Sequence, residues 1–166
     1  MKPNISSSNK TAANTPTTTT TSNVIVAALE VVGIMLLKFP VPLRLWILVL
    51  MYYNVGGIAM FPNDGDIRFG AALTMSQGLI MGYLYQYHGG FTKLLSVGHA
   101  PWLVYVPWLW YLLNKTDQIE DDDVRYHLVG TVVVDAICLL LDLKDFAEYT
   151  FGGKRQATIV WKTKAN

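Results

Sequence analysis

Charged side chains are scarce in this chain of 166 residues. Lys and Arg number 13 and Asp and Glu number 12, so charged residues make up 15% of the sequence, against about 25% in a typical soluble domain. The net charge of +1 gives no reason to expect a nucleic-acid partner. The share of hydrophobic residues, 52%, is too high for an intrinsically disordered chain. Together these values indicate a polytopic membrane protein.

Cysteine is nearly absent as well. Cys138 is the single cysteine, so an internal disulfide is excluded and a disulfide scaffold with it. The sequence also lacks a serine in a nucleophile-elbow motif and a glycine-rich loop of the kind that binds phosphate. We therefore expect that the chain is not an enzyme.

Long apolar segments dominate what the sequence does contain. A spanning helix needs about 20 mostly apolar residues, and the last four segments meet that length, the fourth with kinks expected at Pro101 and Pro107. The first is short and carries Glu30, so it either crosses with a tilt, lies in the interface or re-enters. The sequence predicts an all-α fold, a transmembrane helical bundle of four to five helices. The five segments are 23–39, 43–61, 69–87, 94–113 and 124–143, the last extending toward 149.

The chain divides into a tail, a bundle and a second tail. Residues 1–22 are rich in Ser and Thr and have almost nothing apolar to bury, which predicts a disordered tail. Residues 23–149 form the predicted bundle, in which Pro40, Pro62 and Gly89 mark breaks between segments. Residues 150–166 form a basic tail.

Lys and Arg are unequally shared between the two ends of the segments, and the richer side of a membrane protein is normally cytoplasmic. The poorer side holds three, or five if the first segment spans. We expect the C-terminus to be cytoplasmic and the acidic loop 114–123 to be external. The richer side holds Lys38, Arg44, Lys93, Lys144, Lys154, Arg155, Lys162 and Lys164.

Several groups of residues stand out by their spacing. They are the PLRLW motif at 42–46, Asn54, the GFTKLLSVGHAPW motif at 90–102, Asp135, Asp142, Asp145 and the GKR motif at 153–155. Over residues 24–155 this pattern resembles a group of uncharacterised small bacterial polytopic integral membrane proteins. The resemblance implies a helical bundle in the bacterial inner (plasma) membrane. It implies no activity.

Four polar residues lie near the middle of four segments: Glu30, Asn54, Gln77 and Asp135. A charge at the centre of a bilayer is costly, so the two acids should face the interior, be paired or be protonated. One interpretation is a proton or cation site. The other, which we favour, is that these groups hydrogen-bond across helices and stabilise their packing.

A second polar set lies at the cytoplasmic ends of the segments: Arg44, His99, Asp142 and Asp145. Cys138 shares a helix face with both aspartates. The preferred ion pair is Arg44 with Asp142, because a guanidinium group matches the geometry of a carboxylate. His99 is placed to donate to either aspartate. We expect this network to fix the register of the helices.

Small residues recur at every fourth position of the third segment, at Gly70, Thr74, Gly78 and Gly82. Such a stripe lets a second helix approach closely. The partner helix belongs either to this chain or to a second copy.

Metal ligands are few. His88 and His99 are expected on the cytoplasmic side and His127 on the outer side, and no two histidines are four residues apart. The single cysteine gives no thiolate cluster. We expect no metal and no cofactor.

The favoured function is therefore a structural or accessory bundle in the lipid bilayer that associates with itself or with another membrane protein. The alternative is a small proton- or cation-coupled transporter or channel that uses Glu30 and Asp135. Transporters usually contain internal repeats, and the segments share no spaced motif.

Overall fold

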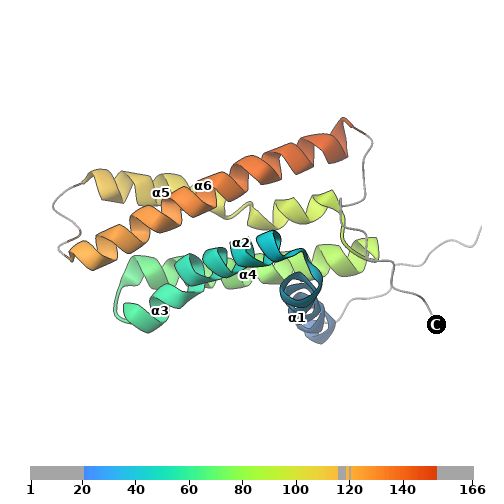
Figure 1. Cartoon of the computed structure of the whole chain (residues 1–166), viewed down its shortest axis with the longest axis horizontal. Helices are drawn as coiled ribbons and strands as arrows, with labels where there is room; N and C mark the ends of the chain where they lie inside the picture. The colour runs from blue at the N-terminus through green and yellow to red at the C-terminus, as the bar shows by residue number, and fades with distance from the viewer. Residues whose placement is uncertain (1–20, 116–118, 120, 153–166) are drawn as a thin grey trace, which may run out of the picture.

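The computed structural model describes residues 21–115, 119 and 121–152, and every regular element among them is a helix (Figure 1). The all-helical prediction is confirmed. The predicted disordered tail, apart from its last two residues, and most of the basic tail lie outside the described residues. The elements are α1 (Thr21–Lys38), α2 (Val41–Met51), the π-helix η1 (Tyr52–Gly56), α3 (Gly57–Met60), α4 (Gly65–His88), the 3-10 helix η2 (Lys93–His99), α5 (Trp102–Asn114) and α6 (Asp122–Thr150).

Local sequence explains most of the helix boundaries. Pro40 separates α1 from α2, because proline lacks the backbone donor that would continue a helix. The carboxylate of Asp64 accepts from the Ile67 backbone N–H at 2.9 Å and caps the start of α4. Gly89 ends α4 with φ of 67°, a left-handed conformation that favours glycine. Asp121 caps α6 in the same way as Asp64 caps α4.

The predicted helix 43–61 is one continuous helical run from Val41 to Met60, interrupted by a π-helical turn. The π turn covers Tyr52–Gly56 and has Asn54 at its centre. Single π turns often occur at functional positions, because they displace one turn of backbone and side chains from the regular α-helical register.

The prediction of one helix over residues 94–113 is wrong. The segment forms the 3-10 helix η2, a break at Ala100, and then α5, which starts at Trp102 and has 13 residues. Pro101 explains the break, because it removes a backbone donor and fits best at the start of a helix. At 1.5 Å per residue α5 is about 20 Å long, which is shorter than the roughly 30 Å hydrocarbon core of a bilayer.

The helices are arranged as a bundle with one helix lying across it. In Figure 1 α4 and α6 run along the long axis, whereas α1 is seen nearly end-on and so crosses α4 at a steep angle. The largest fully buried side chains of the central core include Trp102, Tyr105, Leu109 and Leu128, which come from α5 and α6.

Two helical runs, Val41–Met60 and Asp122–Thr150, are long and apolar enough to cross a membrane by length and composition.

The stripe of small residues on α4 is divided between different neighbours within the chain. A Cβ atom at Gly70 would lie 2.1 Å from the Tyr105 hydroxyl oxygen of α5. A Cβ atom at Gly82 would lie 2.7 Å from the Val24 carbonyl oxygen of α1. Gly78 has open space at the same position. The close approach at Gly82 is what allows α1 to pack across α4.

This contact gives a matched pair of substitutions. Gly82→Ala should destabilise the fold by about 1–3 kcal/mol, because its methyl group meets backbone atoms of α1 that cannot move aside alone. Gly78→Ala should stabilise the fold by about 0.5–1 kcal/mol, because it meets nothing and removes the flexibility of a helical glycine. Thermal unfolding of the purified full chain in detergent measures both. Equal shifts for the two variants would contradict this packing of α1.

Candidate functional site

Asp135 is the most deeply buried ionisable residue among the described side chains, with 0% of its surface exposed. Its Oδ1 atom accepts a hydrogen bond of 2.7 Å from the side-chain amide of Asn54. The Asn54 Oδ1 atom accepts in turn from the Thr74 hydroxyl at 3.3 Å. We call Asp135, Asn54 and Thr74 the Asp135 centre. It links α6, the π turn and α4 through hydrogen bonds between buried or half-buried polar side chains.

The π turn explains why Asn54 and its neighbour reach α6. A π turn changes the pairing of backbone carbonyls, and the Tyr53 carbonyl accepts from the Thr131 hydroxyl at 3.3 Å. The Nε2 atom of His127 lies 2.9 Å from the same carbonyl oxygen. This second set of contacts holds α6 against the π turn beside the Asp135 centre. It was not predicted from the sequence, because an isolated Tyr53 carries no sign of a π turn.

Gln77 lies buried in the interior but is not hydrogen-bonded to Asp135. Its Nε2 atom is buried without a hydrogen-bond partner among the described residues, and so is Oδ2 of Asp135. Of the four residues expected at one depth, Asn54 and Asp135 are thus joined directly, and Gln77 is buried without joining them.

Glu30 lies apart from Asn54, Gln77 and Asp135. The prediction that all four residues lie at one depth in the bundle is therefore wrong for Glu30. Glu30 is exposed on α1 and accepts a hydrogen bond of 3.1 Å from the Tyr85 hydroxyl. Tyr85 follows Thr74 by eleven positions on α4, or about 16 Å along the helix. The expectation assumed that α1 runs alongside its neighbours, whereas α1 crosses α4 near the end of that helix (Figure 1).

A second polar cluster lies one to two turns further along α6. The Nδ1 atom of His99 lies 2.7 Å from Oδ2 of Asp142. The sulfur of Cys138 lies 3.8 Å from the same nitrogen and 3.7 Å from the same oxygen. The imidazole ring stacks on Trp102 with ring centroids 4.5 Å apart and planes at 3°. We call His99, Cys138 and Asp142 the His99 cluster.

The expected pair between Arg44 and Asp142 is not among the ion pairs of the described residues, where Asp142 pairs with His99. The Nε atom of Arg44 is buried without a hydrogen-bond partner in the same part of the chain. Asp145 pairs instead with Lys93, whose Nζ atom lies 3.8 Å away. The rotation of each helix decides these partners, and the charges alone do not reveal it.

Lys93 forms ion pairs at this end of the bundle, and this role was not predicted from the sequence. Its ammonium group contacts the carboxylate of Glu148 as well as that of Asp145. The hydrogen bond with Glu148 raises the pKa of Lys93 above its ordinary value. The ammonium form is therefore favoured, and this contribution to stability is present at neutral pH and lost as the pH rises through the raised pKa.

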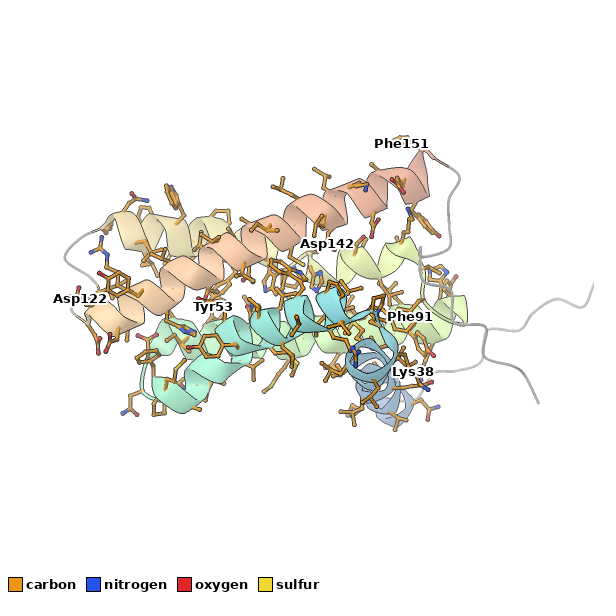
Figure 2. The ribbon with its side chains drawn as sticks, in the orientation of Figure 1. Lys38, Tyr53, Phe91, Asp122, Asp142 and Phe151 are labelled. Carbon is orange, nitrogen blue, oxygen red and sulfur yellow. The ribbon has the colours of Figure 1, made fainter. Side chains whose placement is uncertain are left out.

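A pocket of about 320 Å³ opens beside the His99 cluster, between η2, the start of α5 and α6. His99 and Asp142 form part of its wall, and most of the rest is apolar, including Leu103, Leu139 and Phe146. Figure 2 shows Asp142 on the side of α6 that faces η2. The pocket therefore gives small ligands access to one side of the cluster.

Comparisons with protein-family models, with curated proteins and with solved structures returned no match for this chain.

The hydrogen bond between Asn54 and Asp135 can be tested by changing each partner. Asn54→Ala should cost about 1–3 kcal/mol, because it leaves a buried carboxyl oxygen without its donor. Asp135→Asn should cost less than Asn54→Ala, because the new amide oxygen still accepts from Asn54 and the amide nitrogen replaces an Oδ2 atom that already lacks a partner among the described residues. Unfolding of both variants in detergent, followed by circular dichroism, gives the comparison. The assignment fails if Asp135→Asn is the more damaging change.

Proposed function

We propose that the chain is a polytopic integral membrane protein of a bacterial inner membrane that works as a structural or accessory bundle, associating with itself or with another membrane protein. The single observation that carries this proposal is the distribution of polarity, with polar side chains inside and large apolar side chains outside.

The outer surface of the bundle is strongly apolar. Val104 of α5 is 75% exposed and Leu140 of α6 is 69% exposed, and comparable residues lie on every long helix. Monomeric soluble proteins rarely expose continuous apolar surface of this extent, because water solvates it poorly. In a bilayer the same residues contact lipid chains at no cost. Further large exposed apolar residues are Ile25, Val26, Leu29, Leu37, Leu45, Leu48, Met75, Leu79, Leu103, Val133, Leu141 and Leu143.

The interior holds the polar groups that lipid does not solvate. Asn54, Gln77, Thr131 and Asp135 are each at most 3% exposed. Polar side chains in membrane helices normally face the bundle interior and hydrogen-bond across helices. The Asp135 centre fits that description, since it connects three elements by side-chain hydrogen bonds.

The orientation of α1 supports a membrane boundary at one end of the bundle. If α4 and α6 cross the bilayer, α1 lies close to the membrane plane, because it crosses α4 steeply (Figure 1). It packs against the same end of α4 that precedes Lys93, and it ends at Lys38. Of the three arrangements left open for this segment, the interfacial one agrees best with that crossing. The run 41–60, α4, η2 together with α5, and α6 are then the four segments that span, and the start of α1 lies on the cytoplasmic side.

The closed Asp135 centre supports a packing role over conduction. A carboxylate that takes part in proton or ion transport must exchange protons or ions with water. Asp135 is 0% exposed and accepts a hydrogen bond from Asn54. Glu30, the second acid of the transport alternative, is bonded to Tyr85 at the end of α4. The two acids therefore do not form a shared site.

Two measurements test this proposal. The full chain should stay in the membrane pellet after carbonate extraction, and release into the supernatant would reject an integral protein. Proteoliposomes that contain the chain should lose an imposed proton or potassium gradient no faster than empty liposomes. Faster loss that Asp135→Asn abolishes would establish the transport alternative instead.

The orientation gives a separate prediction. Asp122 lies at the start of α6 (Figure 2). Lys144 lies in the last third of the same helix, and both side chains are exposed. A membrane-impermeant maleimide added to intact cells or spheroplasts should modify Asp122→Cys and spare Lys144→Cys until the membrane is permeabilised. The unmodified chain provides the background, since Cys138 is only 6% exposed. The reverse labelling pattern would overturn the cytoplasmic assignment of the C-terminal end.

A further inference from the structure

We propose that the His99 cluster binds a divalent transition-metal ion of the zinc class through His99 Nδ1, Cys138 Sγ and a carboxylate oxygen of Asp142. These three ligand atoms lie within 4.8 Å of one another. The inference goes beyond the proposed membrane role and does not rest on it, because it depends only on the local geometry of η2 and α6.

The spacing of the ligand atoms suits a tetrahedral ion. Zinc bonds of roughly 2.3 Å to sulfur and 2.0 Å to nitrogen or oxygen place the sulfur about 3.5 Å from each of the other two ligands. In the structure the sulfur lies 3.8 Å from His99 Nδ1 and 3.7 Å from Asp142 Oδ2. The separation of nitrogen and oxygen, 2.7 Å, must open by about 0.6 Å to reach the roughly 3.3 Å that tetrahedral coordination requires.

The chemistry of the ligands also favours this ion class. One imidazole, one thiolate and one carboxylate form a mixed nitrogen, sulfur and oxygen set, which borderline metals such as Zn²⁺ prefer over Mg²⁺ or Ca²⁺. A dication with one thiolate and one carboxylate is a neutral unit. Neutrality lowers the cost of placing the ion among apolar side chains, where an uncompensated charge is expensive.

The fold holds the ligands in place before any ion arrives. Cys138 and Asp142 are four residues apart on α6, so their side chains lie on one face of the helix. His99 ends η2, where the break at Pro101 turns the chain, and its ring is stacked on the buried Trp102. No metal was predicted from the sequence, because neither paired histidines nor several cysteines are present. The third ligand comes instead from a separate element.

The neighbouring pocket supplies the remaining coordination position. Three protein ligands leave one position of a tetrahedral ion open, as in catalytic zinc sites. His99 and Asp142 both line the pocket of about 320 Å³, so the open coordination position of the ion faces that pocket.

Cobalt provides the direct test, because Co²⁺ replaces zinc in such sites and absorbs visible light. The full chain, purified in detergent with a reductant and freed of metal by a chelator, is titrated with CoCl₂. The wild-type chain should bind one Co²⁺ with intense visible bands of tetrahedral coordination and a near-ultraviolet band from the cobalt–thiolate bond. Added ZnCl₂ should remove these bands, since zinc binds more tightly than cobalt.

Substitutions assign the ligands. Cys138→Ser should abolish the thiolate band, and both Cys138→Ser and Asp142→Asn should weaken Co²⁺ binding by more than the roughly 10–100-fold that follows loss of an outer-shell partner. Asp145→Asn is the matched control, because Asp145 lies on the same helix but pairs with Lys93, and it should bind Co²⁺ like the wild type. Circular dichroism of each variant confirms that the helices are retained.

The outcomes separate the proposal from a purely structural cluster. A wild-type chain without a thiolate band, or a Cys138→Ser variant that binds Co²⁺ as the wild type does, would show that the three side chains form a hydrogen-bonded network only. Either result would leave the membrane proposal untouched, because that proposal depends on extraction and flux measurements.

Discussion

The hydrogen bond between Asn54 and Asp135 is the constraint on which the arrangement of the bundle depends. A carboxyl group with no exposed surface needs a donor, and the donor comes from a π turn in a different helical run. The same turn offers the Tyr53 carbonyl to Thr131 and His127 of α6. Rotation of α6, or a regular α-helical turn at 52–56, would break these contacts together. The polar interior thus fixes both the register and the rotation of the two helical runs.

Apolar contacts alone would specify these positions less sharply. If the bundle spans a membrane as proposed, it gains little from moving Leu or Val from lipid to the interior, so close packing and polar contacts decide which helix faces meet. Close packing is seen where α1 approaches Gly82 and where Tyr105 approaches Gly70. The Asp135 centre is a polar contact between helices. The His99 cluster, between η2 and α6, is another polar contact, nearer the end of the bundle that carries Lys93.

The helical class and the breaks at Pro40, Pro62 and Gly89 were predictable from the sequence, because proline and glycine act locally through their own backbone geometry. One helix was predicted where Pro101 separates η2 from α5, because a proline within an apolar run is also compatible with a kinked helix. Whether a proline kinks a helix or ends it depends on how the flanking segments pack, and not on the local residue types alone. The site residues were likewise predictable to the extent that the helices run side by side. Asn54 and Asp135 meet as expected from their depth, because α6 and the run 41–60 are neighbours, whereas Glu30 stays apart because α1 lies across the bundle.

In the proposed arrangement the apolar outer face of this bundle contacts lipid. A spin label at Leu140→Cys in the Cys138→Ser background, in liposomes, reports the surroundings of that face directly, with a label at Asp123→Cys as the comparison. Oxygen, which concentrates in lipid, should relax the label at position 140 more strongly than a water-soluble nickel chelate, and the order should reverse at position 123. Stronger relaxation of the label at position 140 by the nickel chelate would contradict the account.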